Sequence, residues 1–265
     1  MCDDCGCGDP EVVPLEVQEK ILSENDRRAE HNRRHFREAG VLALNLMGSP
    51  GSGKTALLEA TARHYTNRVG GRRGADSHQG GYRRLGAVSG DLATDNDSRR
   101  LERSGIVSRS ITTGSACHLD ARLVHEALHG MAWRELDLFF IENVGNLVCP
   151  AVYDLGQEAN VVALAVTEGE DKPLKYPVMF QKADLVVLTK TDLLPHLPGI
   201  SVEAIRDNLA RVMPEPSLLP VSAVTGEGIE MWVDWLEARR ILAVKGPARE
   251  AAARFQGMAE LVRDW

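Results

Sequence analysis

One glycine-rich stretch constrains the fold of this chain more than any other: Gly48-Ser49-Pro50-Gly51-Ser52-Gly53-Lys54-Thr55. It fits G-x-x-x-x-G-K-[ST], the phosphate-binding loop of nucleoside-triphosphate enzymes. An apolar run of strand length (41–47) precedes it and a helix-forming run (56–62) follows it. Backbone N–H groups converge at such a turn, where a Cβ would obstruct them, and form an anion site. The motif predicts that Lys54 contacts the β- and γ-phosphates and that the Thr55 hydroxyl ligates Mg²⁺.

Strand-like and helix-like runs alternate along the rest of the chain. We expect further strands at 85–89, 107–113, 138–141, 160–166, 183–188 and 218–221, and helices at 15–39, 95–103, 119–128, 202–212 and 229–243. This alternation predicts an α/β fold of the P-loop NTPase type, with a mostly parallel sheet covered by helices on both faces. The stretch 66–84 is rich in Gly and Arg and lacks periodicity, so we expect a mobile surface loop there.

Three segments are expected from composition: a flexible cysteine-rich tail (1–14), a nucleotide-binding domain that begins with a solvated helix (15–245), and a helical C-terminal extension (246–265). The formal net charge of −7 argues against a sequence-independent nucleic-acid binder. No apolar run approaches the length of a membrane span and no signal peptide is evident. We therefore expect a soluble, cytoplasmic protein without nucleic-acid or membrane partners.

Acidic residues follow two of the expected strands, where ligands bind in open α/β sheets. Asp91 follows 85–89, and Glu142-Asn143-Val144-Gly145 follows 138–141. The second group resembles the D-x-x-G element of GTPases, with Glu in place of Asp. An acid there can hold Mg²⁺ and the Gly145 N–H can sense a γ-phosphate. Lys54, Thr55, Asp91, Glu142 and Gly145 are therefore the candidate catalytic residues, and Thr55 and Asp91 the candidate Mg²⁺ ligands.

Two further strand ends indicate recognition of guanine. Thr189-Lys190-Thr191-Asp192 resembles the N-K-x-D motif, in which the Asp accepts two hydrogens from the guanine edge and the Lys stem lies along the base. Thr189 replaces the usual Asn, which puts a tethering contact in question. Ser222-Ala223-Val224-Thr225-Gly226 resembles the S-A-x-x-G loop whose backbone reaches guanine O6. The succession of these motifs at strand ends predicts a GTPase.

The cysteines and histidines suggest metal sites. Cys117, His118 and Cys149 supply an incomplete tetrahedral set, and the sequence alone leaves open whether they meet or are separate structural residues. Three thiols in the tail, together with the α-amino group, suit Ni(II) in a planar site or Zn(II) in a tetrahedral one: Cys2, Cys5 and Cys7. His31 and His35 lie one helical turn apart, but without a neighbouring Cys or carboxylate we expect ordinary surface residues.

Several segments together resemble the HypB family, the GTPases of nickel insertion in [NiFe]-hydrogenase maturation. They are the tail pattern C-x-x-C-G-C, GSPGSGKT, GDLATDND (90–97), TTGSACHLDA (112–121) and ENVGNLVCPA (142–151). The resemblance implies a SIMIBI-type G domain that dimerises with GTP, a Zn or Ni site of Cys117, His118 and Cys149 near the dimer contact, and a tight nickel site in the tail. Asp91 and Asp97 match acidic positions of its switch region. The chain departs from the family pattern at Ser89, at Thr189, in the 66–84 stretch and in the C-terminal extension.

The resemblance implies a slow regulatory GTPase with GTP/GDP, Mg²⁺, Ni²⁺ and Zn²⁺ as ligands. Hydrogenase-maturation proteins and the hydrogenase large subunit are the partners it implies. Two alternatives stay open: a metal-binding chaperone whose GTP site is only structural, and a urease or cobalamin-enzyme accessory GTPase of the same superfamily. A small-molecule P-loop kinase is disfavoured by the guanine motif at Asp192.

Overall fold

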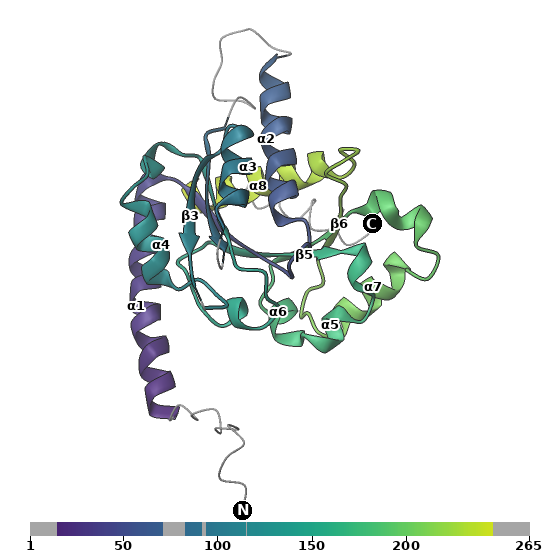
Figure 1. The fold of residues 1–265 in the computed structure, drawn as a ribbon, viewed down its shortest axis with the longest axis horizontal. Helices are drawn as coiled ribbons and strands as arrows, with labels where there is room; N and C mark the ends of the chain where they lie inside the picture. Colours follow the sequence, from purple (N-terminus) through teal and green to yellow (C-terminus); the bar gives the residue numbers. More distant parts are fainter. Residues whose placement is uncertain (1–14, 71–82, 92–93, 115, 246–265) are drawn as a thin grey trace, which may run out of the picture.

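A sheet of seven strands forms the centre of the domain, with helices packed around it in Figure 1. The computed structural model describes residues 15–70, 83–91, 94–114 and 116–245. The strand order is β3-β2-β4-β1-β5-β6-β7, and each pairing between these neighbours is parallel. The strands are β1 (Leu42–Met47), β2 (Leu85–Asp91), β3 (Val107–Thr112), β4 (Leu138–Glu142), β5 (Ala159–Ala165), β6 (Leu185–Thr189) and β7 (Leu218–Pro220). The predicted α/β fold is confirmed.

Helices cover both faces of the sheet, which explains the continuous apolar character of its inner strands. All six residues of β1 are buried, whereas the edge strand β3 has one buried residue among its six. One face packs against α2 (Lys54–Gly70), α3 (Asn96–Arg103) and α8 (Ile229–Lys245), and Trp232 of α8 is fully buried there. The other face packs against α1 (Leu15–Ala39), α4 (Ala121–Leu128), α6 (Pro177–Gln181) and α7 (Val202–Ala210), and α5 (Lys172–Lys175) packs against α6 and α7.

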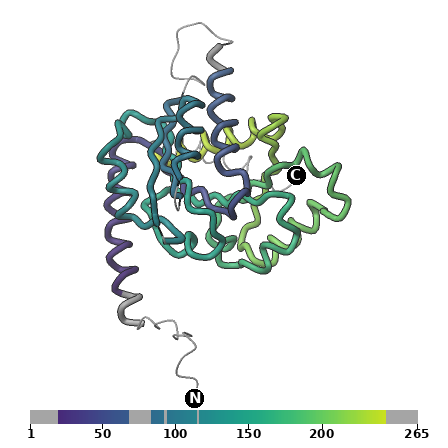
Figure 2. Tube along the Cα trace, viewed as in Figure 1, coloured from purple at the N-terminus to yellow at the C-terminus, as the bar shows by residue number. Residues whose placement is uncertain are grey.

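The first helix, α1, has the bounds that the sequence predicts, but it is less solvated than expected. Its C-terminal half packs against α4, and its first turns extend past the body of the domain (Figure 2). Ala29, Asn32 and Phe36 form a stripe on it that is at most 2% exposed. Two of its asparagines are buried because their amides satisfy backbone groups of other segments, as described below.

Some expectations differ from the structure. Helix α2 continues to Gly70, so the expected loop 66–84 begins too early, and its central residues 71–82 lie outside the described residues. The short helices α5 and α6 and four 3-10 helices were not predicted: Trp133–Glu135, Cys149–Ala151, Val166–Glu168 and Thr191–His196. Such short segments carry little periodicity. The tail (1–14) and the C-terminal extension (246–265) also lie outside the described residues.

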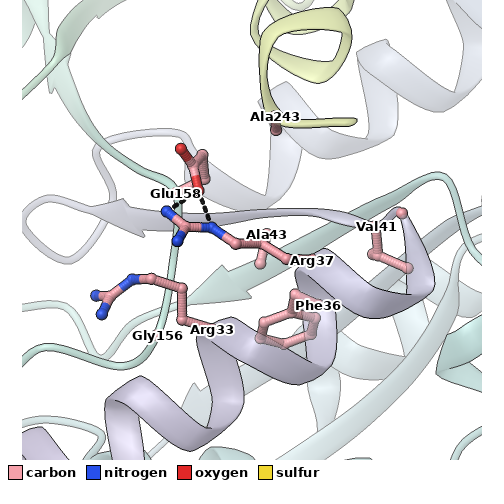
Figure 3. A pocket seen from close by; sticks show the side chains of 9 residues that line it. Arg33, Phe36, Arg37, Val41, Ala43, Gly156, Glu158 and Ala243 are labelled. Carbon is pink, nitrogen blue, oxygen red and sulfur yellow. Dashed lines mark hydrogen bonds and ion pairs between the residues drawn. The ribbon is translucent and has the colours of Figure 1, made fainter. Parts of the chain in front are cut away.

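A small cavity lies between α1 and the sheet, but it is not a ligand site. It measures about 10 Å³ and is lined by residues that include Arg33, Phe36, Arg37 and Glu158 (Figure 3). That volume admits about one water molecule. The Arg37–Glu158 ion pair, 3.2 Å long, lies at its edge. None of the helices in the described ranges is long and apolar enough to cross a lipid bilayer.

Candidate nucleotide and metal site

The phosphate loop connects β1 to α2 in a conformation that requires glycine. Gly48 has φ +144°, and a Cβ there would lie 2.4 Å from the carbonyl oxygen of Ala163. Lys54, the first residue of α2, donates from Nζ to the carbonyl oxygens of Gly48 (3.1 Å) and Ser49 (3.0 Å). Burial lowers the pKa of Lys54, and the nearby Glu142 carboxylate partly offsets that shift. The ammonium is therefore held inside the loop.

Thr55 and Glu142, from the start of α2 and the end of β4, are in direct contact. The Thr55 hydroxyl donates to Glu142 Oε1 over 2.7 Å. Burial raises the pKa of Glu142 to about 7, despite the Thr55 hydroxyl and the Lys54 ammonium. Its other oxygen, Oε2, is buried without a hydrogen-bond partner within the described part of the chain. A buried carboxylate oxygen of this kind fits a bound cation, since Mg²⁺ takes oxygen ligands.

A cavity of about 450 Å³ connects the other candidate residues to this pair. It is lined by the phosphate loop, by the ends of β2 and β4, and by side chains of α3 that include Asp97 and Arg100. Asp91 lines it and accepts a hydrogen bond from the Thr94 hydroxyl. Arg100, which the sequence did not single out, pairs with Glu59 (2.9 Å) and with Asp97 (3.2 Å). An arginine on a short charged helix carries no motif that would have identified it.

Gly145 lies directly against the phosphate loop. A Cβ on Gly145 would come within 2.8 Å of Pro50 N and Cγ, so no larger residue fits without moving one loop. The next residue, Asn146, forms an isolated antiparallel bridge with Gly48. The segment after β4 is thus packed against the phosphate loop at two successive positions.

The two candidate base-recognition loops also meet. The Ser222 hydroxyl, after β7, donates to Asp192 Oδ1 over 2.6 Å and accepts from the backbone N–H groups of Val224 and Thr225. The Ala223 carbonyl accepts from Arg63 on α2 (2.8 Å). Lys190 adopts a left-handed conformation with φ 61°. The loop therefore turns sharply at Lys190, next to Asp192.

Thr189 retains a tether, contrary to the doubt that its replacement of Asn raised. Its hydroxyl donates to the carbonyl oxygen of Ser52 over 2.6 Å, and the residue is 4% exposed. This bond joins the end of β6 to the phosphate loop. The short Thr189 side chain reaches the phosphate loop because β6 ends close to Gly53, and glycine has no side chain to fill the space between them.

Cys117, His118 and Cys149 come together at the surface, although 32 residues separate the cysteines. Their sulfurs lie 2.9 Å apart, and His118 Nδ1 lies 3.8 Å from Cys117 Sγ. Both cysteines are half-buried, so they are not inaccessible structural thiols. The Tyr153 ring stacks on His118 at 3.9 Å and 14°. Burial lowers the pKa of His118, which favours the neutral ligand form. The set can hold an ion such as Zn²⁺ or Ni²⁺.

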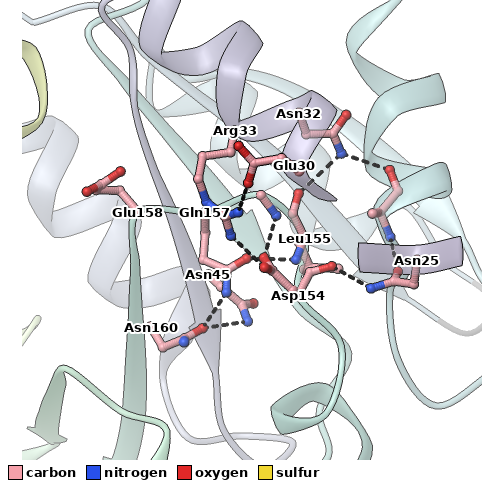
Figure 4. Close-up of polar contacts among 12 residues, drawn as sticks. Asn25, Glu30, Asn32, Arg33, Asn45, Asp154, Leu155, Gln157, Glu158 and Asn160 are labelled. Carbon is pink, nitrogen blue, oxygen red and sulfur yellow. Dashed lines mark hydrogen bonds and ion pairs between the residues drawn. The ribbon is translucent and has the colours of Figure 1, made fainter. Parts of the chain in front are cut away.

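A buried asparagine, Asn143, joins the metal cluster to the nucleotide cavity. It follows Glu142, and its Oδ1 accepts from the backbone N–H of Leu119, next to His118 (3.1 Å), and of Val144 (3.0 Å). Its amide donates to Asn45 Oδ1 (3.1 Å). Asn45 in turn donates to Asn160 (Figure 4). Sequence reasoning missed Asn143 and Asn45, although an asparagine inside the apolar run 41–47 is a signal of a buried polar network.

Comparison with known proteins shows consistent similarity. The family model described as "CobW/HypB/UreG, nucleotide-binding domain" matches residues 42–219. Hydrogenase maturation factor HypB of Rhizobium leguminosarum bv. viciae is 47% identical over 234 residues, which are 87% of this chain and 73% of that protein. HypB of Azotobacter vinelandii is 46% identical over 245 residues, 92% of this chain and 75% of that protein.

Two solved structures are similar to this fold. HypB from Helicobacter pylori in complex with nickel has a TM-score of 0.72 and 34% sequence identity, covering 82% of this chain and 95% of that one. HypB from Archaeoglobus fulgidus has a TM-score of 0.71 and 38% identity, covering 83% of this chain and 100% of that one.

Proposed function

Because this chain belongs to the HypB family of hydrogenase maturation factors, within the CobW/HypB/UreG nucleotide-binding domains, we propose that it hydrolyses GTP to control nickel binding and release during [NiFe]-hydrogenase maturation. The nickel complex of the Helicobacter pylori relative supports nickel as the cargo. One observation carries the assignment. The loop 142–149 supplies Glu142 and Gly145 to the nucleotide cavity and Cys149 to the metal cluster.

For hydrolysis, the chain provides positioning and charge. Lys54 would exchange the carbonyl oxygens of its loop for phosphate oxygens, and Gly145 would present its N–H to the γ-phosphate. Thr55 and Glu142 would hold Mg²⁺, with Asp91 in the same cavity. A bound Mg²⁺ neutralises charge on the transferred phosphoryl group. We assign no side chain as general base.

Selectivity for guanine is assigned to the loops after β6 and β7. The Asp192 carboxylate is held by the Ser222 hydroxyl, which leaves its other oxygen to accept from the base edge. The Lys190 stem would lie along the base, and the backbone at Ser222 and Ala223 would approach O6. The phosphates would lie in the loop 48–55, whose residues are Gly48, Ser49, Pro50, Gly51, Ser52, Gly53, Lys54 and Thr55.

Coupling between nucleotide and metal follows from the loop 142–149. Gly145 and Asn146 pack against the phosphate loop, so a γ-phosphate that displaces Gly145 also displaces the segment leading to Cys149. Asn143 holds the backbone next to His118 at the same time. A movement of the segment 142–149 would therefore shift Cys149 and, through Asn143, the backbone next to His118. By linkage, metal must then change nucleotide affinity by the same factor.

We also propose a GTP-dependent homodimer that forms at the metal cluster. Val148 and Val152 flank Cys149 and are 55% and 50% exposed, which is apolar surface suited to a second copy. Three ligands from one chain leave a coordination position that the second copy could fill. We propose hydrogenase-maturation proteins and the hydrogenase large subunit as its partners, which agrees with the relatives' name, hydrogenase maturation factor.

The tail extends this scheme with a second nickel site. Its cysteines lie outside the described residues, so their role as ligands stays a proposal: Cys2, Cys5 and Cys7. The division into tail (1–14), GTPase domain (15–245) and C-terminal extension (246–265) is likewise part of the proposal. Nickel bound by the tail would be one source of cargo for the GTPase domain.

The decisive experiment measures GTP and ATP hydrolysis together with metal stoichiometry. Wild type should hydrolyse GTP slowly and in preference to ATP. Lys54→Ala should abolish turnover and keep the fold, whereas Lys182→Ala, an exposed lysine after α6, should match wild type. Metal binding without GTP turnover in wild type would instead support a metal chaperone with a structural nucleotide site. Unchanged hydrolysis in Lys54→Ala would overturn the assignment of the phosphate loop.

A further inference from the structure

Four histidines that belong to neither site described above gather where α1 packs against α4. His31 and His35 lie one turn apart on α1; His125 lies on α4, and His129 is the residue that caps the C-terminus of α4. Ring centroids are 4.1 Å apart for His31–His35, 5.1 Å for His31–His125 and 4.7 Å for His125–His129. The sequence predicted ordinary surface residues at 31 and 35. It missed their neighbours because α4 lies about ninety residues further along the chain.

Buried hydrogen bonds fix the two helices against each other. Asn32 donates from Nδ2 to the carbonyl oxygens of Ala121 (2.9 Å) and Leu155 (3.2 Å). Asn25 donates to the Asp154 carbonyl (2.8 Å) and accepts from the Ala121 N–H (2.9 Å). Figure 4 shows these asparagines reaching from α1 into the neighbouring segments. His31, His35 and His125 are thus carried by two helices that these hydrogen bonds fix against each other.

The Asn32 side chain also determines which nitrogen of His125 is protonated. Asn32 Nδ2 donates to two carbonyl oxygens, which fixes the orientation of the amide, so the atom that lies 3.0 Å from His125 Nδ1 is the acceptor Oδ1. His125 therefore carries its proton on Nδ1, and Nε2 keeps a lone pair. That Nε2 faces His129 Nε2 at 3.1 Å. A histidine that ligates a metal usually has this arrangement, with its outer N–H bound to an oxygen.

The distances between donor atoms suit one ion. One possible ligand atom on each of His31, His35 and His125 lies within 4.8 Å of the other two. A tetrahedral ion with bonds of about 2.0–2.1 Å holds its nitrogens roughly 3.3 Å apart, so small ring rotations close the set. Burial lowers the pKa of His35 and of His125, and the neighbouring imidazoles add to this. The neutral form is the one that binds metal.

Arginines around the cluster oppose a cation and limit its affinity. Arg34 donates to His31 Nδ1 (3.0 Å), and the charges of Arg28 and Arg134 also act on these imidazoles. A metal on His31 must displace Arg34 or bind Nε2 after the ring changes tautomer. Arg34 is exposed, so its displacement costs little. We expect binding weaker than that of a thiolate site.

We propose that His31, His35 and His125 form a binding site for a divalent transition-metal ion, with Ni(II) and Zn(II) as the probes. Imidazole donors suit both ions. The site is independent of the proposed GTPase function, since none of its ligands belongs to the nucleotide cavity or to the cysteine–histidine cluster. A result that refutes the histidine site would therefore leave the proposed GTPase function untouched, and a result that refutes the GTPase function would leave the histidine site untouched.

The test removes the other metal sites and titrates what remains. In the full chain with all five cysteines replaced by serine, Ni(II) or Zn(II) with a competing chelator should show one bound ion. His31→Gln and His125→Gln should each weaken binding at least about 10-fold, because loss of even an outer-shell partner of a metal ligand commonly costs that much. His196→Gln, an exposed histidine on the 3-10 helix Thr191–His196, should leave it unchanged. No bound ion, or equal losses in His196→Gln, would overturn the site.

A second measurement keeps the test valid if the cysteine-free protein does not fold. Two-bond ¹H–¹⁵N NMR spectra of the wild-type chain report imidazole tautomers directly. Without metal, His125 should be protonated on Nδ1. Zn(II) added beyond the cysteine sites should shift the ring nitrogens of His31, His35 and His125, with no shift at His196. If these ring signals do not respond to Zn(II), the histidines only pack together and the proposed metal site is refuted.

Discussion

Asn143→Ala tests the proposed link between the nucleotide and metal sites. Asn143 is 1% exposed and makes three hydrogen bonds, with Leu119 N, Val144 N and Asn45. The alanine variant leaves two N–H donors and one amide oxygen without these partners. At about 1 kcal/mol for each bond, the free energy of unfolding should fall by about 3 kcal/mol. A domain with stability in the usual range, about 5–15 kcal/mol, remains folded.

The functional readout is a ratio of metal affinities. Zn(II) or Ni(II) is titrated into tail-deleted protein under reducing conditions, once with GDP and once with a non-hydrolysable GTP analogue. We expect the two affinities of wild type to differ by at least about 5-fold, the lower end of common coupling. In Asn143→Ala the ratio should approach one, because Leu119 and the adjacent His118 are no longer held by the residue after Glu142.

Asn208→Ala is the matched control for this experiment. Asn208 is on α7 and donates one hydrogen bond, to the Glu170 carbonyl (3.0 Å). In Asn208→Ala the free energy of unfolding, measured by urea denaturation, should fall by about 1 kcal/mol. The ratio of metal affinities with GDP and with the GTP analogue should stay at the wild-type value. If Asn143→Ala loses stability but keeps the full ratio, Asn143 is structural only and the coupling runs through another contact. A stability loss no larger than that of Asn208→Ala would refute the energetic reasoning itself.

Three further predictions address base recognition, the tail and acid stability. Asp192→Asn should weaken GTP binding at least about 10-fold and shift preference toward the xanthine nucleotide, because an amide replaces an acceptor with a donor; unaltered GTP affinity in a nucleotide titration would contradict this. A triple alanine variant of Cys2, Cys5 and Cys7 should lose one tightly bound Ni(II) in chelator competition while GTP turnover stays the same. Burial raises the pKa of Glu237, but the Arg83 ion pair (2.8 Å) and other partners outweigh it and the net pKa is lowered. Arg83→Met should therefore lower the free energy of unfolding by about 1–3 kcal/mol at neutral pH. The stability difference between this variant and wild type should shrink as pH falls below the ordinary Glu pKa of about 4.3. Urea denaturation at several pH values would measure it.

Much of the architecture could be predicted from the sequence because it depends on local patterns. The glycines of the phosphate loop, the apolar runs and the residues that follow each strand locate the strands to within a few residues. In a parallel sheet, the carboxyl ends of the strands lie at one edge. Asp91, Glu142 and the phosphate loop therefore had to line one cavity, as they do. Sequence reasoning failed where periodicity is weak, at the end of α2 and at the short helices.

Contacts between distant side chains were decided by the tertiary structure alone. Whether Cys149 meets Cys117, whether Thr189 reaches Ser52, and whether His125 joins His31 all depend on how separate segments dock and how they rotate about their axes. Sequence spacing carries no information on those rotations, because they are set by packing against the sheet and by buried bonds such as those of Asn32. The sequence thus determined which chemical groups this protein has at its strand ends, and the tertiary structure decided which of the remaining groups act together.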